Sequence, residues 1–106
     1  IPDPQNLNII TRLNGKEVQN DNTHSMLHSI KDLIAYISTF TTLSPGDVIL
    51  TGSPGGVGKK RSPPLFLWPG DIVEVEISRI GCLINHIISD NEEYPVTLQS
   101  ELDNAC

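Results

Sequence analysis

The sequence is poor in basic, aromatic and cysteine residues. It has 7 lysines and arginines against 13 acidic residues, a formal net charge of −6, and only 5% aromatic residues among its 106 positions. Nucleic acids need a basic protein face, so nucleic acid is excluded as the main partner. The two cysteines, Cys82 and Cys106, are too few for a disulfide scaffold.

Membrane and export signals are also missing from the sequence. No apolar run approaches the roughly 18 residues of a membrane-spanning helix, and we therefore expect no membrane partner. No secretory signal is visible, which favours a cytoplasmic location, with the mitochondrion as the alternative. The first residue is Ile1 and not Met. We therefore expect the chain to begin inside a longer polypeptide.

Nucleotide-binding motifs are absent as well. The phosphate-binding pattern G-x-x-x-x-G-K-[ST] requires glycine where Ser53 stands and a hydroxyl residue where Lys60 stands. Both mismatches remove a function of the motif, because the glycine permits the tight loop and the hydroxyl holds the metal ion. The sequence therefore excludes a phosphate-loop nucleotide site.

A glycine-rich run at residues 45–58 is the most informative feature present. A turn precedes a short apolar segment at 47–51, which we predict to be a strand covered on both faces. The loop that follows has few side chains, and Thr51 and Ser53 are its nearest hydroxyls. Such a loop lets a ligand approach the backbone closely. The alternative is a tight connection between two strands.

The remaining pattern predicts a mainly β fold with one clear helix. We expect strands at 8–13, 16–19, 72–78 and 82–88, with Asn14-Gly15 as a hairpin turn and residues 20–22 as a polar turn. Ser29 is the expected helix N-cap, and apolar residues at helical spacing follow it as far as Phe40. We assign residues 1–88 to one domain and residues 89–106 to a loosely ordered acidic tail.

Two carboxylates and two histidines are candidate metal ligands. Glu74 and Glu76 lie on one face of a predicted strand and could bind Mg²⁺ or Ca²⁺. Strict alternation with apolar residues favours a solvated strand face instead. His24 and His28 could share a zinc ion, but no third ligand lies near them in the sequence.

Several segments together resemble the fumarylacetoacetate hydrolase family, specifically the C-terminal portion of its catalytic domain. The central segment reads L-S-P-G-D-V-I-L-T-G-S-P-G-G-V-G at residues 43–58. Family members commonly have the sequence L-x-P-G-D-V-I-L-T-G-T-P-x-G-V-G at these positions. Further matches lie at 13–19, 26–38 and 67–85. The resemblance implies part of a mixed β-roll or sandwich.

The resemblance also implies a function. Family members hydrolyse C–C bonds, decarboxylate, hydrate or isomerise oxo-acids such as acylpyruvates and oxo-dicarboxylates, often in catabolism and usually as homodimers. They use Mg²⁺, or Mn²⁺ or Ca²⁺ in its place. By the same resemblance Ser53, Thr51 and Gly52 would bind the carboxylate of the substrate, and Gly55, Gly56 and Gly58 would allow close backbone approach.

The family's metal ligands and its catalytic histidine and lysine lie upstream of the position of Asn8. We therefore expect the metal ligands to be absent from this chain, and its catalytic residues remain unassigned. Glu74 and Glu76 match a C-terminal strand of the family and not its metal-binding strand. We expect the chain alone to be inactive and to associate with the missing N-terminal half. The alternative is a truncated, non-catalytic relative that acts through protein association.

Overall fold

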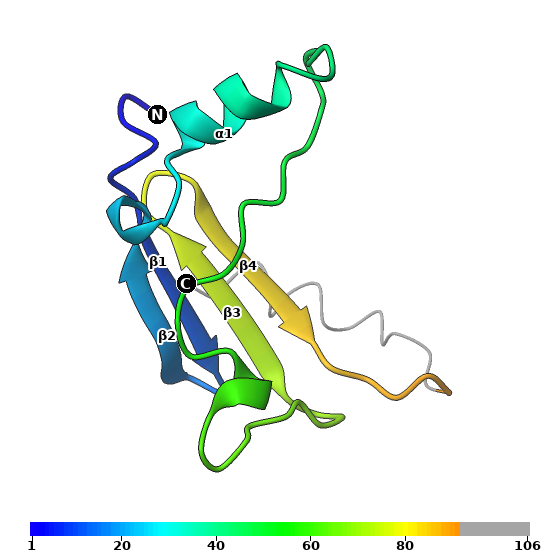
Figure 1. The fold of residues 1–106 in the computed structure, drawn as a ribbon. Coiled ribbons are helices and arrows are strands. Elements are labelled where there is room, and N and C mark those ends of the chain that lie inside the picture. The colour runs from blue at the N-terminus through cyan, green and yellow to red at the C-terminus, as the bar shows by residue number, and fades with distance from the viewer. Residues whose placement is uncertain (92–106) are drawn as a thin grey trace.

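A computed structural model describes residues 1–91 of the chain as a four-stranded antiparallel sheet with one α-helix (Figure 1). The strand order is β2-β1-β3-β4. The elements are β1 (Asn8–Leu13), β2 (Lys16–Asn22), η1 (Thr23–Ser25), α1 (Ile30–Ile37), η2 (Gly58–Lys60), β3 (Ile72–Ile77) and β4 (Gly81–His86). The predicted mainly β fold with one helix is confirmed. Most of the predicted acidic tail lies outside the described residues.

The β1–β2 hairpin forms at Asn14-Gly15 as predicted, and both residues have positive φ, at 52° and 78°. The predicted polar turn at 20–22 is wrong, because β2 continues through these residues to Asn22, which pairs with Asn8 at the start of β1. Asn20 pairs with Ile10 and Asp21 with Ile9. β2 is an edge strand, and polar side chains are well tolerated there because solvent covers its free edge.

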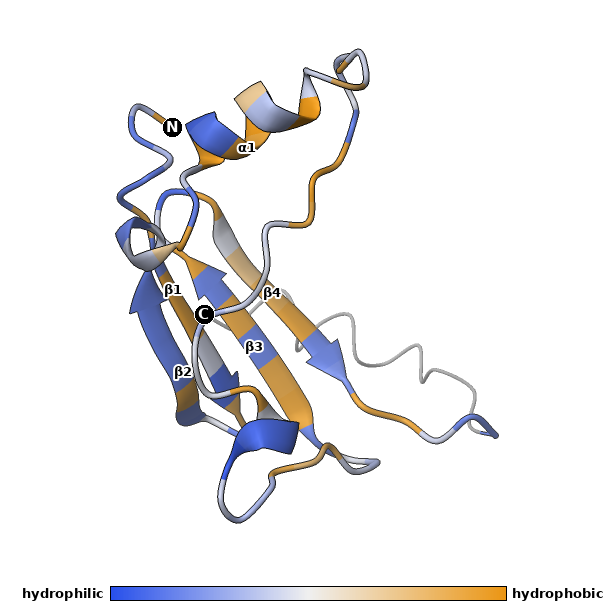
Figure 2. Cartoon of the chain, viewed as in Figure 1, coloured by the Kyte–Doolittle hydropathy of each residue, from blue (hydrophilic) through white to orange (hydrophobic). Residues whose placement is uncertain are grey.

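The sheet has two chemically different faces. Val75 of β3 lies opposite Thr11 of β1 and Leu83 of β4, whereas Glu76 lies opposite Ile10 and Cys82. Residues directly opposite one another share a face. The predicted alternation of valine and glutamate along β3 is therefore confirmed, with the valines on one face and the glutamates on the other. Figure 2 shows the alternation as hydrophobic and hydrophilic bands along β3.

Helix α1 begins where the sequence predicts. The Ser29 hydroxyl accepts a hydrogen bond from the Asp32 N–H at 3.1 Å, and the hydroxyl donates to the Asp32 carboxylate at 2.7 Å. The helix ends at Ile37, so Phe40 lies beyond it and remains 67% exposed. The predicted apolar stripe is therefore one turn shorter than expected.

The predicted strand at 47–51 is wrong. The segment forms no ladder with the described strands, and Val48 and Leu50 are 83% and 93% exposed. An apolar run becomes a strand only when a neighbour satisfies its backbone N–H and C=O groups. Figure 1 shows that this segment belongs to the long coil that descends from the end of α1 to η2.

Buried apolar contacts are few in the described part of the chain. Within residues 1–91, Leu7 is the only buried hydrophobic residue, at 5% exposure. The segment at 65–68 is also largely uncovered, with Trp68 71% exposed. None of the helices described is long and apolar enough to cross a membrane.

Candidate substrate-binding site

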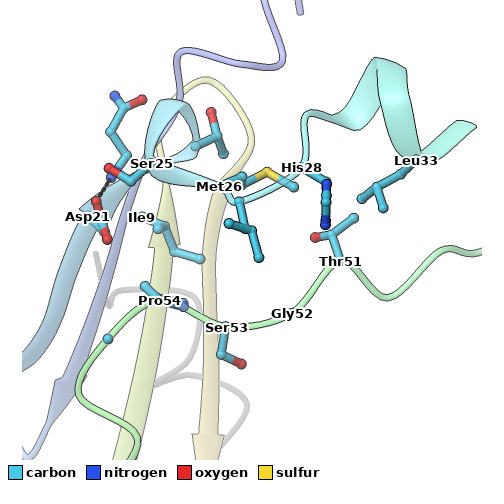
Figure 3. A pocket seen from close by; sticks show the side chains of 14 residues that line it. Ile9, Asp21, Ser25, Met26, His28, Leu33, Thr51, Gly52, Ser53 and Pro54 are labelled. Atoms are coloured by element: carbon cyan, nitrogen blue, oxygen red, sulfur yellow. Dashed lines mark hydrogen bonds between the residues drawn. The ribbon is translucent and has the colours of Figure 1, made fainter.

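The glycine-rich loop closes one side of a pocket of about 490 Å³ (Figure 3). The other sides come from the paired ends of β1 and β2, the segment after η1 and the start of α1. The lining residues are Ile9, Asp21, Asn22, Thr23, Ser25, Met26, Leu27, His28, Leu33, Thr51, Gly52, Ser53, Pro54 and Gly55. All three residues that the sequence assigns to substrate binding, Thr51, Gly52 and Ser53, therefore lie in one pocket.

The loop presents its hydroxyls in two directions. Thr51 and Ser53 are both exposed, and in Figure 3 Thr51 lies at the His28 end while the Ser53 side chain extends away from Met26. Hydroxyls and exposed loop N–H groups are donors that suit a carboxylate oxygen. The loop can therefore bind a small anion at more than one point along its length.

Apolar side chains form the floor and one wall of the pocket. Ile9 comes from β1, Met26 from the segment after η1, Leu33 from α1 and Pro54 from the loop itself. A pocket that combines apolar walls with a few converging polar groups suits a small organic molecule with a short carbon chain.

Asp21 contributes a fixed negative charge on the β2 side of the pocket. The Ser25 hydroxyl and the backbone N–H of Asn22, at 2.8 Å, lower the pKa of Asp21 below its ordinary value. The ionised carboxylate repels a second anion. The acid group of a ligand is therefore favoured near Thr51 and Ser53. No sequence motif identifies Asp21 as a pocket residue. It lies in the pocket because β2 continues beyond residue 19, where the sequence predicts the strand to end.

Of the two histidines that could have shared a zinc ion, His28 lines the pocket. Within the described residues, no group of three or more His, Cys, Asp or Glu side chains lies close enough to hold a metal ion. The donor set described here therefore does not form a metal site.

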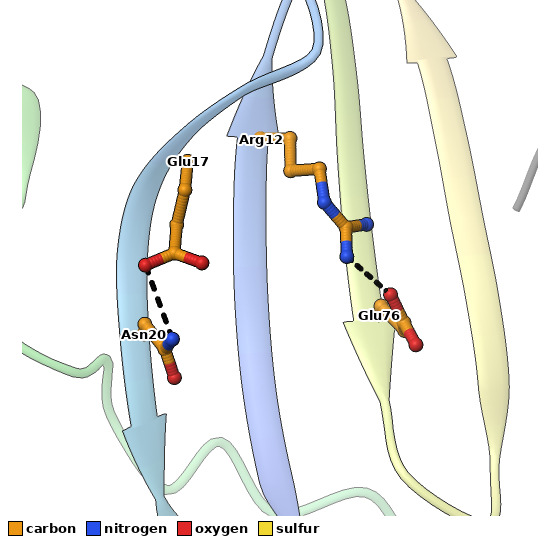
Figure 4. A network of polar contacts seen from close by, with 4 residues as sticks. All are labelled: Arg12, Glu17, Asn20 and Glu76. Atoms are coloured by element: carbon orange, nitrogen blue, oxygen red, sulfur yellow. Dashed lines mark hydrogen bonds and ion pairs between the residues drawn. The ribbon is translucent and has the colours of Figure 1, made fainter.

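Glu74 and Glu76 lie on the sheet face opposite the pocket, since Glu74 pairs with Arg12 whereas the pocket residue Ile9 pairs with Ile77. Figure 4 shows Glu76 beside Arg12. The Arg12 guanidinium donates to the Glu76 carboxylate at 2.6 Å. This hydrogen bond raises the pKa of Arg12, and the charges of Glu76, Glu74 and Glu17 raise it further. The glutamate pair thus serves as a counterion for an arginine, in agreement with a solvated strand face.

Two loop glycines approach the protein's own backbone. A Cβ atom on Gly56 would lie 2.7 Å from the carbonyl oxygen of Val18, and one on Gly58 would overlap the carbonyl oxygen of Leu65. The expectation that Gly56 and Gly58 let a ligand approach the backbone is therefore wrong, because at these glycines the loop packs against the backbone of Val18 and Leu65. Gly52 and Gly55 have open space where a Cβ atom would be.

Residues 1–88 match the family described as Fumarylacetoacetate (FAA) hydrolase C-terminal. The chain belongs to the fumarylacetoacetate hydrolase family. The resemblance drawn from the glycine-rich run and its flanking segments is confirmed, and the matched residues include all of these segments.

Named enzymes of the fumarylacetoacetate hydrolase family are similar to the chain. It is 51% identical over 88 residues to the mitochondrial oxaloacetate tautomerase Fahd2a of Rattus norvegicus, covering 83% of this chain and 28% of the relative. The chain therefore spans less than a third of the length of this curated relative.

Solved structures of the family show the same fold. A fumarylacetoacetate hydrolase from Exiguobacterium antarcticum superposes with a TM-score of 0.79 at 39% identity, over 82% of this chain and 31% of that one. A maleylpyruvate hydrolase from Sphingobium sp. SYK-6, in complex with manganese(II) and pyruvate, superposes with a TM-score of 0.73 at 32% identity. This superposition covers 83% of this chain and 31% of the hydrolase chain. The sheet and helix are therefore part of a fold of the fumarylacetoacetate hydrolase type.

Proposed function

We propose that the chain is part of an enzyme that acts on short oxo-acids and that its loop at 51–55 binds a carboxylate of the substrate. The observation that carries this proposal is that Thr51, Gly52 and Ser53 all line one pocket with both polar and apolar side chains. The 51% identity to an oxaloacetate tautomerase supports oxaloacetate or a similar oxo-dicarboxylate as the substrate.

Tautomerisation is the reaction we favour. In the keto-to-enol direction, a base removes a proton from the carbon next to the carbonyl group. The C–H electron pair forms the C=C bond, and the carbonyl oxygen then takes up a proton, so atoms and charge balance. The residues of this chain position the substrate: Ser53 and Thr51 would donate hydrogen bonds to one carboxylate, and the charge of Asp21 would keep both carboxylates away from the β2 side of the pocket.

A divalent metal ion would stabilise negative charge on the enolate oxygen when bound. The described residues do not form a site for it, so we place its ligands outside residues 1–91. The manganese(II) and pyruvate complex of the maleylpyruvate hydrolase supports a divalent metal, and Mg²⁺ is our first choice.

Association with further protein follows from the exposed apolar side chains. Val48 is 83% and Leu50 93% exposed, and both are large aliphatic residues that favour contact with another protein surface. We propose that the remaining part of the family's domain covers them and supplies the other wall of the pocket. A homodimer is the assembly we expect. The naming of the rat relative as mitochondrial favours that location over the cytoplasm.

The proposal is tested by following the loss of enol absorbance when oxaloacetate is added to the complete protein that carries this chain, with Mg²⁺ present. We expect the complete protein to accelerate the interconversion and the 106-residue chain alone to leave it unchanged. Acceleration by the isolated chain would show that the metal ligands are not missing. No acceleration of any oxo-acid reaction by the complete protein would favour the non-catalytic alternative.

A further inference from the structure

A β-bulge in β2 determines which side chains face the glycine-rich loop. Thr11 pairs with Gln19, but its neighbour Arg12 pairs with Glu17, so Val18 is an extra residue without a partner on β1. An extra residue reverses the alternation of side chains along a strand. Gln19 therefore shares the face of the loop, although Glu17 is only two positions away.

Hydrogen bonds on both faces agree with this reversal. Asn20 donates to the Glu17 carboxylate at 3.1 Å on the charged face of the sheet (Figure 4). On the opposite face, the Gln19 amide donates to the carbonyl oxygens of Pro54 and Gly55 at 3.1 and 3.3 Å. One side chain of β2 thus holds two successive peptide groups of the loop.

Arg61 connects the bulge to the far end of the loop. The same guanidinium nitrogen donates to the Val18 carbonyl oxygen at 2.6 Å and to the Gly56 carbonyl oxygen at 3.5 Å. Arg61 directly follows η2 and is its C-cap, so η2 determines the position of the Arg61 backbone. The carbonyl of the bulge residue, which has no partner on β1, receives its hydrogen bond from this arginine.

We infer that Gln19 and Arg61 are positioning residues that fix the loop against the Val18 bulge and so hold Thr51 and Ser53 in place for the ligand. The role in ligand binding rests on the proposed function. The anchoring of the loop does not, because it follows from the hydrogen bonds alone. Neither residue needs to touch the substrate. Their effect passes through the carbonyl groups of residues 54–56.

Two variants test the inference in the complete protein. Gln19→Met and Arg61→Met keep the length and the apolar stem of each side chain but remove the hydrogen-bond donors. Asn20→Ala, on the other face of the same strand, and Lys59→Met, which removes one charge from η2, are the matched controls. Arg61→Lys keeps the charge and one donor, and it should restore part of the lost effect.

NMR relaxation order parameters of the loop amides at 51–53 and 55–57 are the readout that does not depend on activity. We expect both methionine variants to lower these order parameters from about 0.85 toward about 0.6, since each lost hydrogen bond to a loop carbonyl frees the loop, with no change in β3. Equal loop order parameters in the Gln19→Met and Asn20→Ala proteins would overturn the inference. So would a uniform fall across loop and sheet, which indicates general destabilisation.

Steady-state kinetics separate positioning from catalysis. We expect KM for the oxo-acid to rise about fivefold in both methionine variants while kcat changes less than about twofold, because the loop binds ground state and transition state alike. Lower loop order parameters with an unchanged KM would contradict the positioning role. If the wild-type protein turns over no oxo-acid, the proposed function fails, and the relaxation experiment still decides whether the loop is anchored.

Discussion

A Cβ atom on Gly56 would lie 2.7 Å from the carbonyl oxygen of Val18, which is closer than a carbon atom can approach without displacing its neighbour. Gly56 also has a φ of +95°, in the region that L residues rarely adopt. Two separate constraints therefore require glycine where the loop crosses the β-bulge.

Gly56→Ala and Gly70→Ala separate these constraints. Gly70 has nearly the same φ, +96°, but nothing lies within 4 Å of its Cβ position. Both variants should lose roughly 1 kcal/mol of stability through backbone strain. Only Gly56→Ala should also displace the loop and raise KM for the oxo-acid, by about tenfold or more. Equal KM values in the two variants, measured with wild-type protein as reference, would show that the contact with Val18 is unimportant.

Asp71 should make stability depend on acid pH. The Asn14 side-chain amide, at 2.9 Å, and the Trp68 N–H, at 2.8 Å, donate to its carboxylate and lower its pKa from the ordinary 3.8. A carboxylate whose pKa is lower in the folded than in the unfolded state stabilises the fold at pH values above its unfolded-state pKa. This stability is lost as the pH falls through the folded-state pKa.

The predicted window therefore lies below 3.8, at the acid end of the stability profile. Asp71→Asn should be less stable than the wild type at pH 7, and the difference should shrink as the pH falls through that window. Urea unfolding from pH 2 to pH 7 measures this, with Asp90→Asn as a control for the loss of one exposed carboxylate. A difference that is constant across the range would contradict the assigned hydrogen bonds.

Glu76 should not contribute to metal binding. Its carboxylate is paired with Arg12 at 2.6 Å on the sheet face away from the pocket. Glu76→Gln should leave the affinity of the complete protein for Mn²⁺ unchanged within about twofold, whereas loss of a carboxylate ligand lowers metal affinity by roughly tenfold or more. Calorimetric titration with Mn²⁺ distinguishes these results, and a tenfold loss would place Glu76 in the metal site.

Local sequence chemistry predicts the hairpin turn at Asn14-Gly15 and the helix start well, but not residues 20–22, where β2 continues. The Pro-Gly-Asp sequences at 45–47 and 69–71 form turns with the same kind of local hydrogen bond: Asp47 accepts from the Ser44 N–H at 2.7 Å, and Asp71 accepts from the Trp68 N–H at 2.8 Å. The Ser29 cap and the Asn14-Gly15 turn depend in the same way on residues within a few positions of each other. Their outcome is therefore independent of distant parts of the chain.

Features that need a distant partner are not predictable in this way. The apolar segment at 47–51 reads as a buried strand, but a strand requires a neighbour, and the described strands provide none. The bulge at Val18 has no glycine or proline to mark it. Gln19 therefore looks like an ordinary residue of a polar strand until the pairing with Thr11 and the contact with Pro54 are known. The pocket combines residues from the hairpin, the helix and the loop in the same non-local way.

We propose Ser53 as the main contact for the substrate carboxylate. Titration of the complete, Mg²⁺-loaded protein with oxalate, a mimic of the enolate, tests it in wild-type, Ser53→Ala and Ser53→Thr forms. We predict that Ser53→Ala weakens oxalate binding by about tenfold or more, since a hydrogen bond to a charged group is lost, and that Ser53→Thr binds within about threefold of the wild type. Equal affinity of the alanine variant and the wild type would contradict the claim.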